Sequence, residues 1–264
     1  KIEFWAWPNI LAFDAALIAV GWQWVFAISN NEGPNLASSA VLCLSVWLTY
    51  IADRLFDVAR RPSRDLLSHR HRFAKQNQGI LWTVWMVILV ANLTIAFPGL
   101  SSKQLFNGFI LLSLCLTYTG LNHALSKHFF PKELLVAIIF AGGTQVFLSK
   151  PVGKLSIFAF GLLCFMNCII IAKKEKAVDA GLNVRSISSV LDTRLLNILL
   201  AVGILCALFS SDPVALLPTA FCLTLLQLYR RHFATERFRV LCDTSLLITP
   251  GLYLLFGSGG VFVR

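Results

Sequence analysis

A chain of 264 residues with 57% hydrophobic and only 14% charged residues cannot fold as one soluble domain, because such domains carry roughly 25% charged residues. Its apolar residues form long continuous runs, which excludes a membrane β-barrel of short alternating strands. The net charge of +10 does not indicate a nucleic-acid partner, which would need a basic face on a soluble module. Composition therefore predicts an all-α integral membrane protein.

Nine apolar runs are candidate membrane spans, since a spanning helix needs about 20 mostly apolar residues. They cover residues 10–28, 36–54, 79–98, 104–122, 132–149, 155–172, 191–210, 213–229 and 239–257. The first run is too long for a cleaved signal peptide, and no small-residue cleavage site follows it. We expect a single transmembrane domain over residues 1–264, with nine helices in a ring-like bundle and a central cavity that opens near the cytoplasmic side.

Basic residues in the loops predict how this bundle is oriented. Of the 23 Lys and Arg residues, 18 lie at the loops that follow even-numbered runs and only 3 at those that follow odd-numbered runs. Basic loops stay on the cytoplasmic side of a membrane. The amino terminus and the even-numbered loops are therefore predicted to be cytoplasmic, and the carboxyl terminus to lie outside.

Two pairs of acidic residues mark the cytoplasmic ends of the second and sixth runs. Asp53 and Asp57 are four residues apart, and so are Glu175 and Asp179. This spacing places both members of a pair on one helical face, where two like charges destabilise the helix unless a cation lies between them. The pairs are offset by the same 122 residues, which suggests an approximate repeat of residues 10–122 in residues 132–229.

Carboxylates surrounded by basic residues suit one class of ligand. Mg²⁺ prefers hard oxygen ligands and bridges to substrate phosphates, and Arg or Lys can neutralise a diphosphate. The candidate metal ligands are the four paired acids. The candidate diphosphate-binding residues are Arg54, Arg60, Arg64, Lys127, Lys173 and Lys174. The alternative is that these charges only pair with one another across loops at the membrane border.

This pattern resembles the UbiA superfamily of intramembrane prenyltransferases, which has nine helices and acidic motifs at the cytoplasmic ends of helices two and six. The segment Thr49-Tyr50-x-x-Asp53-Arg54-x-x-Asp57 is similar to the last half of the first motif. Glu175-x-x-x-Asp179-Ala180-Gly181 is similar to the second motif, with Glu in place of its first Asp. The resemblance implies Mg²⁺-dependent ionisation of an allylic prenyl diphosphate inside the lipid bilayer.

The sequence also departs from the family pattern. Thr49 and Tyr50 replace an Asn and an Asp of the first motif, which removes one potential metal ligand. Family members often carry a Tyr in helix four with a Lys one turn later. Here Tyr118, the candidate catalytic residue at that position, is followed by Asn122, and Lys127 lies further on. The chain therefore looks like a divergent member whose acceptor cannot be inferred.

Two more acids, Asp14 and Asp243, lie within the first and ninth runs at about the depth of the acidic pairs. Either is a candidate proton acceptor, and either is equally well explained as a salt-bridge partner of Arg54, Arg194 or Arg239.

Three functions remain open at this point. The first is a prenyltransferase with a separate acceptor. The second is a terpene cyclase, in which the carbocation attacks its own chain. The third is a transporter or a non-catalytic membrane protein. Inverted repeats with broken helices would favour a transporter, but the apparent repeat here is parallel and Gly or Pro breaks within the runs are few.

Overall fold

The computed structural model describes residues 2–59, 62, 66, 68–125, 131–175, 187, 191–211 and 213–256. Over these residues the regular structure is helical, without strands. The elements are η1 (Phe4–Ala6), α1 (Trp7–Ile10), α2 (Phe13–Ser29), α3 (Leu36–Ala59), α4 (His69–Gln76), α5 (Gln78–Gly99), α6 (Ser102–Leu125), α7 (Lys132–Gln145), α8 (Lys154–Lys174), α10 (Thr193–Leu208), α11 (Pro213–Leu228), η4 (Arg230–His232), α12 (Thr235–Ser245) and α13 (Ile248–Phe256).

Each predicted run coincides with helical structure, but the helices differ in their capacity to cross a membrane. In the described part of the chain, α3, α5, α6 and α8 are long and apolar enough to span it. A fifth candidate is the bent unit of Phe4–Ile10 and Phe13–Ser29, and α10 and α11 are shorter apolar helices. An all-helical protein with several membrane spans is thus confirmed, whereas the count of nine spans stays a prediction.

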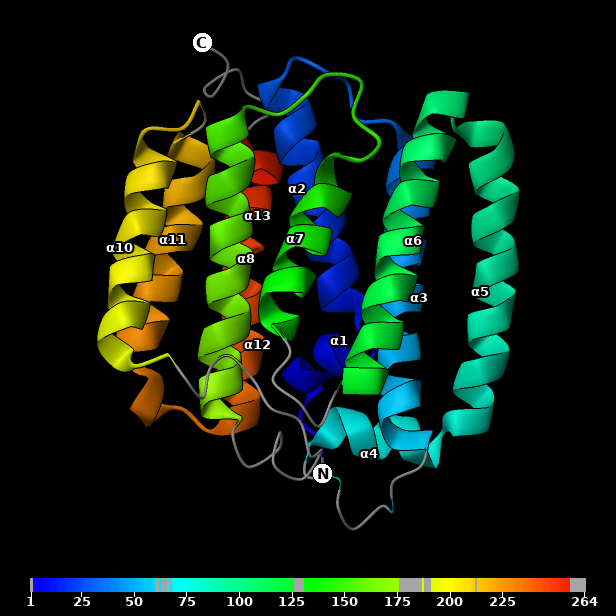
Figure 1. Cartoon of the computed structure of the whole chain (residues 1–264), viewed down its shortest axis with the longest axis horizontal. Helices are drawn as coiled ribbons and strands as arrows, with labels where there is room; N and C mark the ends of the chain where they lie inside the picture. The colour runs from blue at the N-terminus through cyan, green and yellow to red at the C-terminus, as the bar shows by residue number, and fades with distance from the viewer. Residues whose placement is uncertain are drawn as a thin grey trace.

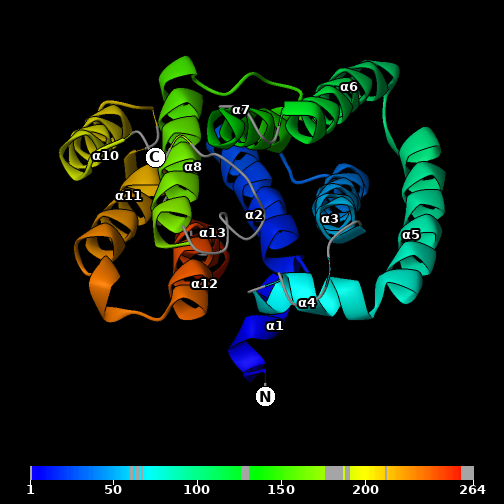
Figure 2. The ribbon, with the colours of Figure 1, turned by 60° about the horizontal axis from the view of Figure 1, so that its bottom comes forward.

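The long helices stand side by side, and the short α4 lies across one end of the bundle (Figure 1). Helix α2 is central, because it contacts α3, α7, α12 and α13. Turning that end forward shows α3, α5 and α6 on one side of α2, and α8, α10 and α11 on the other (Figure 2). The contact of α2 with α12 and α13 brings the first and last predicted spans together, as the ring-like arrangement requires.

An aromatic cluster anchors α2 in the core. Trp22 and Phe26 pack on Phe160 of α8, with ring centroids 4.3 Å apart for Trp22 and Phe160. The Trp22 indole Nε1 also donates a hydrogen bond of 2.7 Å to the carbonyl of Leu246, between α12 and α13. Burying a large aromatic ring and satisfying its polar atom together fixes α2 against α8 and the end of the chain.

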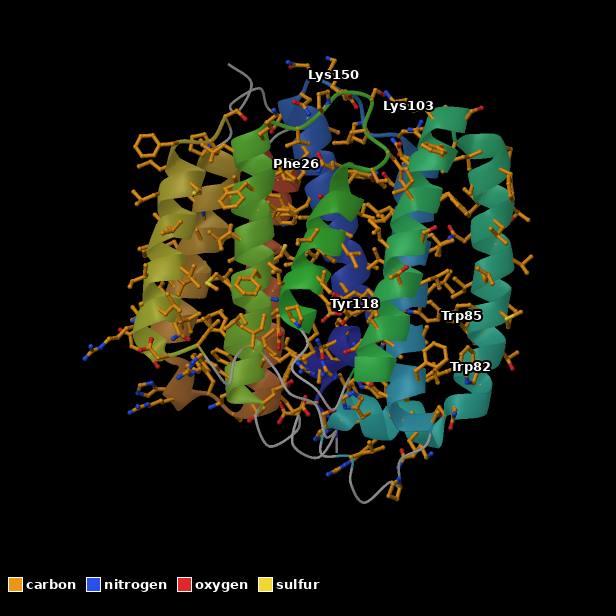
Figure 3. All side chains as sticks on the ribbon, viewed as in Figure 1. Phe26, Trp82, Trp85, Lys103, Tyr118 and Lys150 are labelled. Carbon is orange, nitrogen blue, oxygen red and sulfur yellow. The ribbon has the colours of Figure 1, made fainter. Side chains whose placement is uncertain are left out.

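Large apolar side chains cover the outside of α5 and α6, including the exposed Phe97, Phe106 and Phe109. In water such a surface would be unfavourable, but it fits the hydrocarbon of a bilayer. Figure 3 shows Lys103 and Lys150 at one end of the bundle, while Trp82 and Tyr118 lie toward the end that carries α4. Basic residues of odd-numbered loops thus share the end opposite α4.

Candidate active site

A polar cavity of about 250 Å³ lies between the helices next to α4. Its walls combine five acidic residues of the sequence prediction with residues from α1, α2, α3, α4, α6, α7, α8 and α12. Its charged lining residues are Asp14, Asp53, Arg54, Asp57, Arg70, Lys132, Glu133, Glu175, Arg239 and Asp243. Segments that are far apart in the sequence therefore meet at one charged site.

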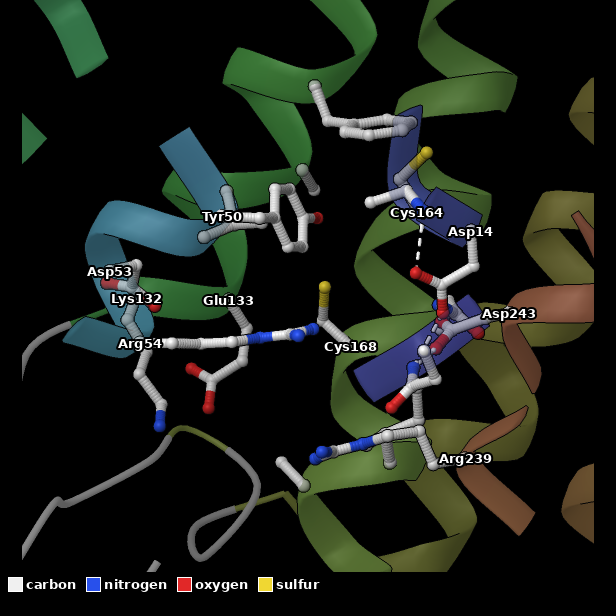
Figure 4. Close-up of a pocket in the computed structure, with 18 of the residues that line it drawn as sticks. Asp14, Tyr50, Asp53, Arg54, Lys132, Glu133, Cys164, Cys168, Arg239 and Asp243 are labelled. Carbon is white, nitrogen blue, oxygen red and sulfur yellow. Dashed lines mark hydrogen bonds between the residues drawn. The ribbon is translucent and has the colours of Figure 1, made fainter. Parts of the chain in front are cut away.

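Asp53 and Asp57 both face this cavity from the last turns of α3. The Asp57 carboxylate lies 3.7 Å from Nε2 of His71 on α4. Figure 4 shows Lys132, the first residue of α7, on the same side of the cavity as Asp53. The first predicted acidic pair is thus an acidic wall with basic groups facing it from α4 and α7.

Glu175 follows the last residue of α8 and is 4% exposed. Its Oε2 forms an ion pair with Arg239 of α12 and lies 3.7 Å from Nη2 of Arg70 on α4. Its other oxygen, Oε1, is buried without a hydrogen-bond partner in the described part of the structure. Burial lowers the pKa of the Arg70 guanidinium below its usual value, and carboxylates, Glu236 first, oppose that shift.

Helix α4 lies across one end of the bundle and lines the cavity with Arg70 and His71, and polar contacts fix it in place. Ser68 caps its amino terminus by accepting a hydrogen bond from the backbone N–H of His71. Lys75 donates to the carbonyl of Val58 at 2.9 Å, at the end of α3. The backbone N–H of His69 donates to Glu236 of α12 at 3.0 Å. The basic helix α4 therefore connects α3 to α12.

The break between α1 and α2 is held by Arg54. Its Nη1 donates a hydrogen bond of 2.6 Å to the carbonyl of Ile10, and Ala12 takes a left-handed conformation with φ of 59°. This turn lets Asn9 and Asp14, on opposite sides of the break, both line the cavity. Arg54 lines the cavity too, so the residue predicted to contact a diphosphate also shapes the wall.

Asp14 and Asp243 meet across the bundle. Both line the cavity, and Asn9 donates a hydrogen bond to each carboxylate. The partner of Arg239 is Glu175 rather than either of these acids. Neither acid forms an ion pair within 4 Å among the described residues.

The other predicted site residues fall into two groups. Lys173 and Lys174 donate to the carbonyls of Leu191 and Arg230 and do not line the cavity. The remaining residues lie outside the described part of the chain, so their roles stay predictions: Arg60, Arg64, Lys127 and Asp179.

A second, mainly apolar chamber of about 160 Å³ adjoins the charged cavity. It runs between α2, α3, α6 and α7, and Leu42, Leu111 and Ile139 are among its lining residues. The residues that line both spaces are Tyr50, Asp53, Tyr118, Val136 and Phe140. Tyr118 therefore stands where a charged compartment becomes an apolar one.

Sequence reasoning missed four polar residues of the cavity: Asn9, Lys132, Glu133 and Asn167. Their signal was weak, because a single amide or a charge at the start of an apolar run is usually a border residue. Asn9 and Asn167 are each 6% exposed. An amide side chain within or beside an apolar run was the signal in the sequence that could have identified these two residues, because a buried amide needs hydrogen-bond partners.

The donor atoms of the cavity fit a magnesium ion that is shared with a substrate. Mg²⁺ is commonly held by one or two carboxylates plus substrate phosphates. Asp53 and Asp57 supply two carboxylates on one helical face, and Glu175 adds a buried oxygen without a hydrogen-bond partner in the described structure. The described residues contain no group of three His, Cys, Asp or Glu side chains that could hold a metal by themselves.

Comparisons with known proteins identify a solved structure with the same architecture. No family model matches the sequence, and no curated protein matches it. Among solved structures, the apo structure of a UbiA homolog from Aeropyrum pernix K1 superposes with a TM-score of 0.64. The match covers 93% of this chain and 98% of that chain, at 16% sequence identity.

The chain has the UbiA fold. The resemblance predicted from two short acidic motifs is thereby confirmed at the level of architecture. An identity of 16% shows the fold alone, and the chemistry of this UbiA-fold protein depends on the groups in its own cavity.

Proposed function

We propose that this protein ionises an allylic prenyl diphosphate within the membrane and transfers the prenyl group to a second substrate. The observation that carries this proposal is the junction of a charged cavity with an apolar chamber through shared lining residues. A prenyl diphosphate has the same division, with an anionic head and a hydrocarbon tail. The UbiA superfamily, whose fold this chain shares, includes prenyltransferases and cyclases.

The charged cavity offers groups suited to a diphosphate. Arg70 Nε and Arg239 Nη1 are buried donors without a hydrogen-bond partner in the described structure, and a diphosphate oxygen would satisfy them. Lys132 and Arg54 add positive charge to the same cavity. Mg²⁺ held by Asp53 and Asp57 would supply further charge neutralisation to the leaving group, and Glu175 remains a proposed ligand through its Oε1. Asp179, Arg60, Arg64, Lys127, Lys173 and Lys174 remain proposed contributors to binding of the diphosphate and its metal.

The apolar chamber suits the prenyl chain and the cation that forms on it. Tyr50, Tyr118 and Phe140 stand at the entrance to the chamber, and aromatic faces attract a cation in a desolvated site. We assign this role to Tyr118, which comes from the fourth predicted span. The chamber has few polar groups, so it would keep water away from an allylic cation.

Cyclisation of the prenyl diphosphate is the alternative reaction. The same aromatic entrance favours it, because a cation held there could attack a double bond of its own chain. The two reactions share the ionisation step and differ in whether a second substrate enters the product.

We further propose that all nine predicted runs cross the bilayer, including the short α7 and the paired α12 and α13. In this orientation the charged cavity opens on the cytoplasmic side, where α4 and the even-numbered loops lie.

Incubation of the purified protein in lipid nanodiscs with farnesyl, geranylgeranyl and longer prenyl diphosphates tests the proposal. Diphosphate release should require Mg²⁺ or Mn²⁺ and should stop in excess chelator, and mass spectrometry should identify the prenyl product. Asp192→Asn is the matched control, because Asp192 is an exposed acid that caps α10 and does not line the cavity. Absence of release with every chain length would favour a transporter or non-catalytic role instead.

A further inference from the structure

The cavity contains a second polar centre on the wall opposite Asp53 (Figure 4). Asn9 Nδ2 donates hydrogen bonds of 2.6 Å to Asp14 Oδ2 and 3.0 Å to Asp243 Oδ2. Asn167 Nδ2 donates another, of 3.0 Å, to Asp243 Oδ1. Four residues from three distant parts of the chain, called here the amide–acid cluster, are thus linked into one hydrogen-bonded unit.

The amide–acid cluster has more acceptors than donors. The backbone N–H of Ala15 supplies the remaining hydrogen bond, to Asp14 Oδ1 at 2.8 Å. Asn167 Oδ1 is buried and has no hydrogen-bond partner in the described structure. A buried carbonyl without a donor is costly and is rare in folded proteins. A group that donates a hydrogen bond would satisfy this oxygen.

The hydrogen bonds within the cluster show which position this partner would occupy. Asn9 points its amide hydrogens at both carboxylates, so the space between them is filled by a donor. Asn167 likewise donates from Nδ2 to Asp243, which also faces the cavity. The Oδ1 atom of Asn167 is therefore beside this carboxylate. A hydroxyl group fits this pair, since it donates one hydrogen and is small and uncharged.

We propose that the amide–acid cluster binds the hydroxyl group of the prenyl acceptor and that Asp243 receives its proton. This inference rests on the proposed prenyl transfer and names the class of its second substrate. Asn167 would orient the hydroxyl group, while Asn9 holds Asp14 beside Asp243. A proton on Asp243 relieves the repulsion between the two neighbouring carboxylates, which favours its transfer.

The atoms of this step balance without a redox partner. The bond between C1 of the prenyl chain and the diphosphate oxygen breaks, and its electron pair leaves with the diphosphate. A lone pair of the acceptor hydroxyl oxygen forms the new C–O bond, and the hydroxyl proton moves to Asp243. The products are a prenyl ether and diphosphate. In Figure 4, Tyr50 stands between the wall that carries Asp53 and the wall that carries Asp14 and Asp243.

The test measures how much prenyl ether forms for each diphosphate released. Farnesyl diphosphate and Mg²⁺ are supplied with glycerol or with phenol, which present an aliphatic and an aromatic hydroxyl group. The wild-type protein should form an ether with at least one of them. Asp243→Asn should lower the ratio of ether to released diphosphate by at least ~10²-fold, the usual scale for loss of a general base. Asp192→Asn should leave this ratio unchanged.

A second variant keeps the proposal testable if Asp243→Asn does not fold. Asn167→Leu preserves the approximate volume but removes the carbonyl that lacks a donor, so the concentration of glycerol or phenol for half-maximal ether formation should rise at least ~10-fold. An ether ratio within two-fold of wild type in Asp243→Asn would overturn the base assignment. Diphosphate release that yields only hydrocarbon or water-derived products would overturn the hydroxyl acceptor while leaving ionisation intact. No release by the wild type would contradict the proposed function itself.

Discussion

At the scale of single residues, the charged cavity is defined by acids whose surroundings differ. Asp53 lies on the α3 wall near Lys132, Glu175 is paired with arginines, and Asp243 is held by amides. The same carboxylate group therefore serves as a predicted metal ligand, an ion-pair partner and a proposed base, according to its neighbours. Substitutions that keep shape and remove charge can separate these roles.

Asp53→Asn should reduce Mg²⁺-dependent diphosphate release on the order of 10²-fold or more, because an amide keeps the shape of the side chain but loses the charge that holds a cation. Steady-state assays over a Mg²⁺ titration check this. The unfolding temperature should change little, which separates a lost ligand from a lost fold. Full turnover of the variant would leave Asp53 without a metal role.

The ion pair of Glu175 with Arg239 should contribute measurably to the free energy of unfolding. Both side chains are 4% exposed, so Glu175→Gln leaves a buried guanidinium without its counter-charge and should cost about 3 kcal/mol. The double variant Glu175→Leu with Arg239→Met should recover most of that loss, because an apolar pair of similar volume can replace a buried ion pair without loss of stability. Unfolding in detergent would measure both. Equal stability of Glu175→Gln and wild type would contradict the pairing.

At the scale of elements, the cluster of Asp14 and Asp243 depends on close packing of α2 against α13. Gly21 on α2 faces Pro250, and a Cβ added at Gly21 would lie 2.7 Å from the Pro250 Cβ. The absence of a side chain at this point lets the two helices approach. The indole of Trp22 then bonds to Leu246 just beyond α12, which holds the end of α12, and with it Asp243, next to α2.

Gly21→Ala should therefore destabilise the protein by about 1–3 kcal/mol, the usual cost of overpacking, and should also lower turnover by displacing Asp243. Gly120→Ala is the matched control, because Gly120 lies in α6 and a Cβ there meets nothing within 4 Å. Thermal unfolding of the two variants in the same detergent compares them. A Gly21→Ala protein as stable as the Gly120→Ala protein would show that α2 and α13 can separate without cost.

At the scale of the whole molecule, the orientation in the membrane is open to direct measurement. Lys103 and Lys150 lie at the end of the bundle opposite α4 (Figure 3), and Arg231 belongs to the basic η4 next to α12. The basic loops should be cytoplasmic. Cysteines introduced at Lys103 and Lys150 should react with a membrane-impermeant maleimide on intact cells. A cysteine at Arg231 should react only after permeabilisation, with the native protein as the background control. The reverse labelling pattern would invert the topology.

The sequence by itself determined the helical membrane class, the positions of the helices and the acidic end of α3. These features follow from local properties, because apolar length predicts a span and a four-residue spacing places Asp53 and Asp57 on one face. The two acidic motifs, through their resemblance to those of the UbiA superfamily, also predicted the UbiA fold, although no family model matches the sequence. The sequence also placed Asp14 and Asp243 at one depth, since depth follows from position along a helix.

Only the tertiary structure decided which charges meet. Arg239 was a candidate partner for Asp14 or Asp243 and pairs with Glu175 instead, because this choice depends on how α12 is rotated against α8. Lys132, Asn9 and Asn167 enter the site through the packing of α7, the bend before α2 and the inner face of α8. The contacts of Glu175 with Arg239 and of Asn9 and Asn167 with Asp243 join residues more than 60 positions apart. No periodicity along the chain encodes them, since each is fixed by the shape of side chains between helices.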